Sequence, residues 1–531
     1  MSILTPAWIR DRTAQSPLVL FLLASVVAAA TILAPAYLLI RVADAGDATW
    51  DVLMASATWE AMLRTALLSA AVTAGCIALG LPLAWLTVRT DLPLRGMWAV
   101  LLVLPLVVPS YVGAFIFVAA LGPRGMLQDL LEPLGVETLP EIYGFKGAWL
   151  ALTLFSYPYV LLPVRAALKG LDPAQEEAAK GLGQGAFATF LRVSLPQLRP
   201  ALAAGGILAA LYTLSDFGAV SILRFDSLTR IIYIHYTSAF DRTSAATLGL
   251  LLVVLALVIV SLEGVSRGRS LYYSQGQMRR SRRVALGVWR WPAFAFCLLV
   301  VGAGVGLPVS VVLFWLVRGV MADETLSFVR EATVNSVYAS GLAAVVAVCA
   351  SIPVAMLSVR HAGPLSSLLE RISYSGFALP AISIALALVF FAANYTPFVY
   401  QTLSLLIFAY VIRFLPQALG ACRTSLLQVN PRVEEAARGL GFGPAQVFAR
   451  VTVPQILPGL SAGAILVFLT AIKELPATLL LSPIGFDTLA TEIWSASAEG
   501  FFARAALPSL ILLAVSGIPM ALLVLREREV R

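Results

Sequence analysis

The sequence predicts an all-α membrane protein of about twelve transmembrane helices, arranged as two tandem domains of six helices each. Three observations lead to this prediction. Of the 531 residues, 60% are hydrophobic and only 12% are charged, whereas soluble domains carry about 25% charged residues. The apolar runs continue for about 20 residues, the length of a helix that crosses a bilayer, and do not alternate as barrel strands do. One polar segment also occurs twice with the same spacing of glycines, prolines and acids.

The expected spans follow the apolar runs in order. They are 17–40, 65–88, 97–121, 147–168, 201–222, 245–263, 292–317, 336–358, 372–393, 398–420, 459–481 and 505–525. The first run is too long for the apolar region of a signal peptide, so we expect it to be retained as a helix. Lys and Arg outnumber Asp and Glu on the side that holds both termini. Because positive residues stay in the cytoplasm, we expect both termini and both copies of the repeated segment to be cytoplasmic.

The repeat extends over most of the chain. The segment EEAAKGLGQGAFATFLRVSLPQLRP at 176–200 returns 258 positions later as EEAARGLGFGPAQVFARVTVPQILP at 434–458. Earlier in each half the offset is 271, as between Pro109 and Pro380. Two halves of six helices have the same orientation, which makes this a parallel repeat.

These offsets set the predicted domain boundaries. The first half covers 1–265 and the second covers 291–531, and a linker at 266–290 joins them. The linker contains seven arginines and no acid. That composition fits a cytoplasmic linker under the positive-inside rule, and a binding site for acidic lipid is the alternative.

Each copy lies within a polar stretch, about 170–200 in the first half and 428–458 in the second, which we call the repeated loops. Asp172 and Asn430 are suited to N-cap a helix that begins with proline. We expect the glycines that follow to supply the positive φ that ends this helix, and we assign the left-handed geometry to Gly181 and Gly439. A second short helix is expected to end at the proline before the next span. A surface-lying amphipathic helix is the alternative, but two matching copies favour a surface for docking a partner.

The repeated loops resemble the signature loop of permease subunits in binding-protein-dependent ABC importers. The residues that carry the resemblance are Glu177, Ala178, Ala179, Gly181 and Gly183 in the first loop, and Glu435, Ala436, Ala437, Gly439 and Gly441 in the second. The resemblance implies that each loop sits in a groove of a cytoplasmic ATPase. The chain has no GxxxxGK[ST] phosphate-binding motif. We therefore expect two copies of a separate ATPase subunit to bind the ATP, with no cofactor and no catalytic residues in this chain.

The fused form with two signature loops resembles the ferric-iron and the thiamine permeases. The stretches at 214–223 (LSDFGAVSIL) and 472–494 (IKELPATLLLSPIGFDTLATEIW) resemble the ferric-iron branch. The resemblance implies a permease of the bacterial inner membrane for ferric iron, delivered by an extracytoplasmic binding protein. Thiamine, polyamine or phosphonate are alternative substrates. An ion-coupled secondary transporter is the alternative from another class, and the repeated loops disfavour it.

Charged and polar residues inside the predicted spans are the candidates for the translocation path. Asp216 and Glu474 occupy equivalent positions, and Tyr212, Lys473 and Arg413 are the further candidates. Charges in a bilayer are costly and usually face a cavity or a partner. Oxygen donors suit a hard cation, but these carboxylates could instead fix helix packing, and Arg413 could pair with Glu474. No Cys/His cluster predicts a metal site, and topology explains the net charge of +8 without nucleic acid.

Overall fold

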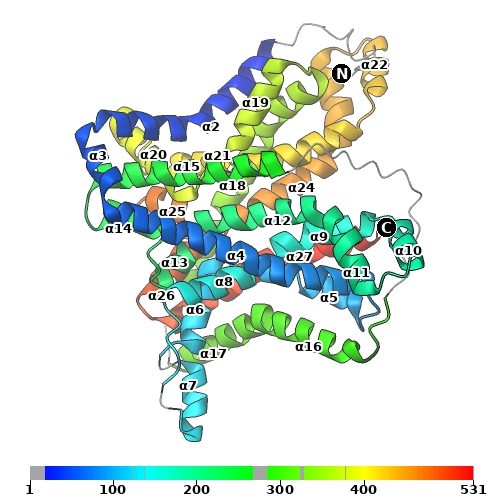
Figure 1. Cartoon of the computed structure of the whole chain (residues 1–531). Coiled ribbons are helices and arrows are strands. Elements are labelled where there is room, and N and C mark those ends of the chain that lie inside the picture. Colours follow the sequence, from blue (N-terminus) through cyan, green and yellow to red (C-terminus); the bar gives the residue numbers. More distant parts are fainter. Residues whose placement is uncertain are drawn as a thin grey trace. The chain divides into compact units, whose positions relative to one another are not determined.

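The computed structural model describes residues 18–123, 125–136, 138–266, 284–322, 328–376 and 378–529. Within these ranges the regular structure is helical, and the extended pairing is a single isolated bridge between Thr90 and Val284 (Figure 1). The predicted all-α class is therefore confirmed.

Eleven helices in the described part of the chain are long and apolar enough to cross a membrane. They fall at 18–44, 56–89, 110–134, 145–170, 190–215, 242–261, 287–321, 329–360, 403–428, 444–471 and 502–519. Two shorter apolar helical segments lie at 95–107 and 381–395. The second of these falls within the predicted span 372–393, so the apolar helices agree with the predicted number of about twelve.

Two predicted spans are wrong as continuous helices, because a proline interrupts each at the same place in the repeat. In the predicted span 97–121, α5 (Arg95–Leu101) and a short 3₁₀ turn precede α6 (Ser110–Leu121). In 372–393, α19 (Pro364–Ser375) ends before α20 (Ala381–Tyr395). Pro109 and Pro380 are the extended N-cap residues of α6 and α20. Proline lacks an N–H and disfavours helical geometry in the residue before it, so the helix restarts there.

The predicted spans 201–222 and 459–481 are also interrupted. The long helices α12 (Leu195–Ser215) and α24 (Val453–Ala471) end before the short helices α13 (Gly218–Ile222) and α25 (Pro476–Leu481). Each break holds one of the two candidate carboxylates, Asp216 or Glu474. The backbone of these spans is therefore irregular at the positions that the repeat predicts to be functional.

The helices group into two compact units that draw on both halves of the sequence. One unit combines Met1–Thr49 with Arg330–Ala490, and the other combines Trp50–Val329 with Thr491–Arg531. The first long helix of the chain thus belongs with helices of the second half, and the last long helix belongs with helices of the first half.

The first unit is held together by an apolar core between its long helices. Its helices are α2 (Leu18–Asp44), α18 (Phe328–Arg360), α19, α20, α21 (Leu403–Gln428), α22 (Pro431–Gly439), α23 (Pro444–Val447), α24 and α25. The buried side chains Ala28, Val354, Leu419 and Ile456 belong to one cluster. They come from α2, α18, α21 and α24, so this core needs helices from both ends of the sequence.

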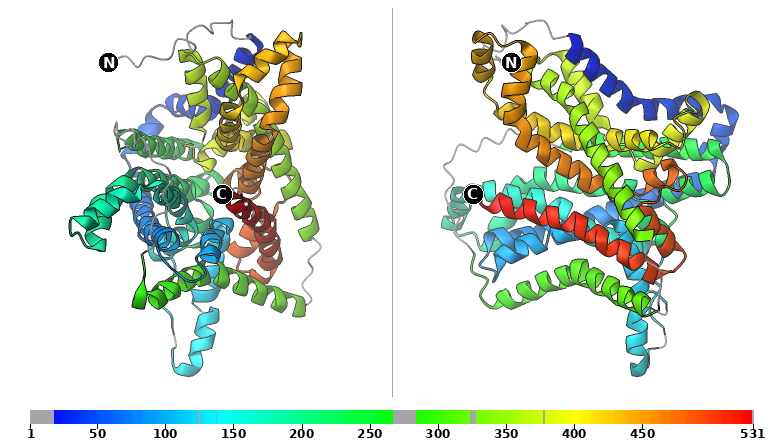
Figure 2. Two further views of the ribbon diagram at one scale, coloured as in Figure 1. Left: turned by 90° about the vertical axis from the view of Figure 1, so that its right-hand side faces the viewer. Right: turned by 180° about the vertical axis from the view of Figure 1, so that it is seen from behind.

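The second unit packs its helices through close backbone contacts. Its helices include α4 (Ser56–Arg89), α5, α6, α7 (Met126–Leu131), α8 (Phe145–Ser156), α9 (Pro158–Gly170), α10 (Pro173–Gly181), α11 (Ala186–Thr189), α12, α13, α14 (Leu228–Thr237), α15 (Arg242–Ser266), α16 (Arg290–Val301), α17 (Leu307–Met321) and α27 (Phe502–Glu529). A Cβ at Gly205 would lie 2.7 Å from the Cα of Val160. Helices α4, α9 and α12 pack against one another, and α27 packs along α17 (Figure 2). Small residues permit such close approach in membrane helices.

The chain passes from one unit to the other at three places, which lie within α3 (Asp47–Met54), at the start of α18 and within α26 (Leu489–Ala498).

Candidate functional site

Each repeated loop folds as a helix, a tight turn and a second helix. The helices are α10 and α11 in the first loop and α22 and α23 in the second. The Asp172 carboxylate accepts a hydrogen bond from the Ala174 N–H at 3.0 Å, and the Asn430 side chain accepts one from the Arg432 N–H at 3.1 Å. These bonds satisfy N–H groups that the first turn of a helix leaves without partners. The expected capping residues are therefore found in both copies.

The turn after each first helix depends on one glycine with positive φ. These residues are Gly183 (φ 82°) and Gly441 (φ 88°). One residue later, the Gln184 N–H donates to the Ala179 carbonyl at 3.1 Å, and the Phe442 N–H donates to the Ala437 carbonyl at 3.2 Å. This bond is the 6→1 bond of a Schellman motif, in which a left-handed residue closes the helix.

The assignment of the left-handed geometry to Gly181 and Gly439 is therefore wrong. Both are the last residues of their helices, and neither has positive φ. A Schellman turn places its left-handed residue two positions beyond the last helical residue, so the geometry falls on the second glycine of each pair. A Cβ at Gly181 or Gly439 would meet no heavy atom of this chain within 4 Å.

The remaining residues of the motif divide into an inner and an outer set. Ala179 and Ala437 are buried, with 7% and 6% of their surfaces exposed. Four motif residues lie on the exposed side: Glu177, Ala178, Glu435 and Ala436. Each first helix thus packs against its own loop through one alanine and presents an acid, an alanine and the Gly181 or Gly439 position to the outside.

The second helix of each loop was expected to end at its proline, but it does not end there. A π-helical turn instead carries it directly into the next span. These turns are η3 (Phe190–Ser194), which leads into α12, and η6 (Phe448–Thr452), which leads into α24. Pro196 and Pro454 lie in the first turn of those spans, where the missing N–H costs little. Each repeated loop is therefore continuous with the span that follows it.

Sequence reasoning missed the inward acid of each motif. The residues just before Glu177 and Glu435 are Glu176 and Glu434, and each forms an ion pair with the arginine that ends a long helix earlier in its half, α4 or α18. The Oε1 atom of Glu176 lies 3.3 Å from Nη2 of Arg89, and the Oε1 atom of Glu434 lies 3.1 Å from Nη2 of Arg360. A signal was available, because Arg89 and Arg360 are equivalent in the repeat.

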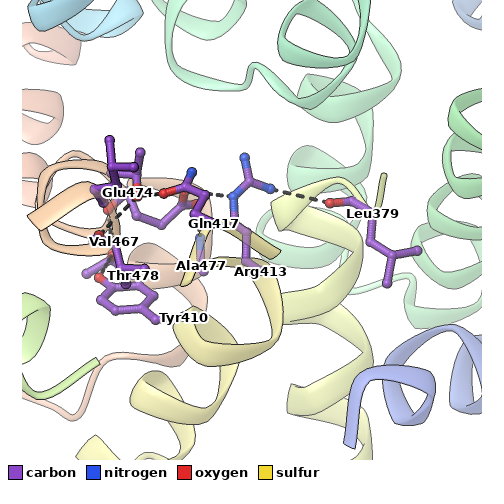
Figure 3. Close-up of polar contacts among 10 residues, drawn as sticks. Leu379, Tyr410, Arg413, Gln417, Val467, Glu474, Ala477 and Thr478 are labelled. Atoms are coloured by element: carbon purple, nitrogen blue, oxygen red, sulfur yellow. Dashed lines mark hydrogen bonds and ion pairs between the residues drawn. The ribbon is translucent and has the colours of Figure 1, made fainter. Parts of the chain in front are cut away.

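In the first unit, the candidate residue Glu474 is buried and paired. Its Oε2 atom lies 3.1 Å from Nε of Arg413, and its Oε1 atom accepts the Ala477 N–H of α25 at 3.4 Å (Figure 3). Its backbone carbonyl accepts the Thr478 hydroxyl at 2.6 Å, and Thr478 lies 2.5 Å from the Tyr410 hydroxyl. Of the alternatives left open for Arg413, the structure shows the ion pair with Glu474. Lys473 is half-buried next to it in the chain.

In the second unit, Asp216 holds the equivalent place with different partners. Its Oδ1 atom accepts the Ala219 N–H of α13 at 3.0 Å, and its other carboxylate oxygen accepts a hydrogen bond from the Ser110 hydroxyl. The ring of the candidate residue Tyr212 lies 5.4 Å from that of Tyr159, centroid to centroid. The position equivalent to Arg413 is Phe155. Both carboxylates therefore cap a short helix, and Glu474 also pairs with an arginine.

The predicted linker has an ordered end. Residues 267–283 lie outside the described ranges, but Val284 pairs with the end of α4, donating its N–H to the Arg89 carbonyl at 2.9 Å. The Asp91 carboxylate accepts the Leu286 N–H at 2.9 Å and lies 3.1 Å from Nη2 of Arg290. The linker end and the first repeated loop thus meet at the same end of α4.

We expect acid, or the substitution Asp91→Asn, to release this anchor. The Leu286 N–H and the Arg290 guanidinium hold the pKa of Asp91 below its ordinary value of 3.8. A group whose pKa is lowered by folding stabilises the fold above its unfolded pKa, and the stabilisation is lost as the pH falls through the folded pKa. The anchor should therefore hold at neutral pH and open below about pH 4.

Hydrogen exchange of the Leu286 amide measures this release. At neutral pH, exchange should be faster in Asp91→Asn than in the natural chain. The Leu489 amide, which donates to the Ser336 hydroxyl at 2.8 Å in the first unit, is the control and should not change. Equal protection of Leu286 in both proteins would contradict the anchor.

Among the residues that the structure describes, no three His, Cys, Asp or Glu side chains are grouped so that they could hold a metal ion. The carboxylates that the sequence singles out in the spans are engaged by helix N-termini, a hydroxyl or an arginine.

Residues 76–269 and 347–531 each match the family of binding-protein-dependent transport system inner membrane components. The chain belongs to this family, and the prediction of a transport permease built from two repeats is confirmed. It is 33% identical to the Fe(3+)-transport system permease protein FbpB 2 of Haemophilus influenzae over 92% of this chain and 94% of that protein. It is 24% identical to the ferric transport system permease protein FbpB of Actinobacillus pleuropneumoniae over 71% of this chain and 58% of that protein. The molybdenum transport system permease protein ModB of Escherichia coli is 32% identical over 30% of this chain and 69% of its own length.

Proposed function

We propose that this chain is the membrane-spanning permease of an ATP-driven importer that carries ferric iron. The observation that carries the proposal is the pair of repeated loops, each with an equivalent cap, the same left-handed glycine and an equivalent ion pair to the arginine that ends an earlier long helix. The ferric substrate is supported by the similarity to a named Fe(3+) permease along almost the whole chain.

The partners follow from the loops. Each loop presents an exposed acid, an exposed alanine and a glycine position with open space around it. Such a surface, low in bulk and held by a rigid turn, suits insertion into a groove of another protein. Two loops in one chain call for two copies of a cytoplasmic ATPase subunit. A binding protein outside the membrane delivers the substrate.

The orientation is supported by the end of the linker. Val284 and the first repeated loop both contact Arg89, so the described end of the basic linker and that loop lie at one end of the second unit. Basic segments next to spans stay in the cytoplasm. We therefore propose that the repeated loops and both chain termini lie on the cytoplasmic side of the bacterial inner membrane.

The candidate path residues remain a proposal: Asp216, Tyr212, Lys473, Glu474 and Arg413. The breaks after α12 and α24 bring carboxylate oxygens to irregular backbone within the spans, and irregular backbone at membrane depth usually lines a cavity. A hard cation would have to compete with the helix N-termini and with Arg413 for these oxygens. It would therefore be held weakly, as rapid passage requires.

Uptake of radioactive ferric iron by iron-starved cells tests the proposal. Cells that lack the gene should lose the uptake, and the intact gene should restore it. Labelled thiamine and molybdate are measured beside it, because the alternative substrates predict a loss in one of those. Unchanged iron uptake with a loss of thiamine or molybdate uptake would contradict the ferric assignment and keep the permease class. Transport by the purified chain on an ion gradient alone would favour a secondary transporter.

A further inference from the structure

One glutamate ties each repeated loop to the end of an earlier span and to the start of the span that follows the loop. In the second unit, Glu176 pairs with Arg89 at 3.3 Å and accepts the Ser194 hydroxyl at 2.8 Å. In the first unit, Glu434 pairs with Arg360 at 3.1 Å and accepts the Thr452 hydroxyl at 3.1 Å. The same three-residue cluster therefore occurs once in each unit.

The arginine and the hydroxyl residue of each cluster lie at the ends of helical elements. Arg89 and Arg360 are the last residues of α4 and α18. Ser194 and Thr452 end the π-helical turns that lead into α12 and α24. The glutamate therefore joins the end of one span to the beginning of a later span, the one that follows the loop. The π turns at the start of that later span are of a kind that is frequent at functional sites.

Burial makes these bonds sensitive to the loss of one member. The side chains of Arg89 and Glu176 are 5% and 19% exposed, and those of Arg360 and Glu434 are 11% and 7% exposed. An exposed ion pair contributes little, whereas removal of one partner of a buried pair leaves an uncompensated charge. The neighbouring acids Glu177 and Glu435 are exposed. Two adjacent acids of the motif thus have different surroundings, and one faces inward.

The spans joined by the clusters are themselves parts of the packed cores. Helix α4 packs against α9 and α12, while Val354 of α18 lies in the core formed with α21 and α24. A displacement of the end of α4 or α18 therefore reaches several spans, because packed cores shift between discrete arrangements and do not deform continuously.

We propose that Glu176 and Glu434 are positioning residues that transmit motion of the repeated loops to the spans. Each passes a displacement of its loop to α4 and α12, or to α18 and α24, through Arg89 and Ser194 or through Arg360 and Thr452. The proposal rests on the proposed function, since it requires an ATPase that moves the loops. It assigns the inward acid of each motif to coupling within this chain.

The test separates coupling from docking. Affinity-tagged full-length chain is purified from its own cells with the ATPase subunit that accompanies it, and ATP hydrolysis, retained ATPase subunit and iron uptake are measured. Glu176→Gln combined with Glu434→Gln should lower uptake roughly tenfold, while the ATPase subunit stays bound and hydrolysis continues. Exchanging the charges, as Arg89→Glu with Glu176→Arg, should recover part of the uptake lost in Glu176→Gln.

A matched control is the pair Arg423 and Glu370, whose Nε and Oε1 atoms lie 2.8 Å apart between α21 and α19. Glu370→Gln removes a similar charge pair outside the repeated loops and should keep uptake near that of the natural chain. Because Gln at position 176 or 434 could also weaken folding, Ser194→Ala with Thr452→Ala provides a milder break of the same clusters. It should lower uptake in the same direction.

Three outcomes would overturn the proposal. These are full uptake in the double glutamine variant, a loss of uptake that parallels loss of the ATPase subunit or of the inserted chain, and an equal loss in Glu370→Gln. Failure of the proposed function would look different. The natural chain itself would then retain no ATPase subunit or carry no iron. If the natural chain carries a different solute, uptake of that solute is measured for the variants.

Discussion

Replacing Gly183 and Gly441 by valine should abolish transport while the chain still inserts in the membrane. Both glycines hold φ above 80° in the turn that closes the first helix of each repeated loop. A β-branched residue in this conformation costs about 1–3 kcal/mol, which is enough to change the path of a loop of this size. We expect each single variant to lose most iron uptake and the double variant to fall to background, as measured with labelled iron in starved cells.

The matched control for this prediction is Gly135→Val. Gly135 also has a left-handed backbone (φ 84°) and open space around it, but it lies in the segment between α7 and α8, away from the repeated loops. Its substitution costs a similar strain and should leave uptake near normal. Equal losses from Gly135→Val and Gly183→Val would show that strain anywhere suffices, and normal uptake in the double variant would contradict a rigid coupling turn.

We expect the substitution Arg413→Phe to lower the stability of the chain, which is the second large effect. Phenylalanine is the residue at the equivalent position of the first half, Phe155. The change leaves the carboxylate of Glu474, which is 7% exposed, without its cation. Breaking a buried pair from one side costs about 3–5 kcal/mol. The melting temperature of the detergent-purified chain, followed by intrinsic fluorescence, should fall markedly.

A second substitution distinguishes the lost pair from lost packing. Arg413→Phe with Glu474→Gln removes both charges, so it should be more stable than Arg413→Phe alone, and the difference gives the coupling between the two sites. Glu60→Gln breaks an exposed pair with Arg64, in which the two side chains are 50% and 64% exposed, and should change stability by less than about 1 kcal/mol. If the double variant is no more stable than Arg413→Phe, the ion pair is not the source of the effect.

The features predicted well from sequence are those with a local physical cause. Apolar length determines the spans, and the caps at Asp172 and Asn430 follow from short-range hydrogen bonding. The repeat located both loops because equivalent positions share residue types. The left-handed residue was placed two positions too early, because a Gly-x-Gly sequence offers two candidates and only the closing hydrogen bonds select one of them.

The features that the sequence did not predict depend on contacts between distant segments. The burial of Glu176 follows from Arg89, which is far away in the chain, and nothing local distinguishes it from Glu177. The breaks at Pro109 and Pro380 are an exception, because their cause is the proline itself, and hydropathy alone predicts one continuous helix there. The grouping of helices from both halves into each unit has no signature in hydropathy, because the apolar runs resemble one another and do not identify which helices pack together.

That grouping sets an order of events in biosynthesis. Helix α2 emerges from the ribosome first, yet Ala28 shares its core with Val354 and Ile456, which are synthesised more than 300 residues later. At about 5–20 residues per second, the helix waits for tens of seconds in the membrane before its partners exist. The second unit is likewise completed only when α27 has been made. Neither unit can finish folding from one half of the gene, so a chain cut at the linker would need both pieces in the same membrane to build either unit.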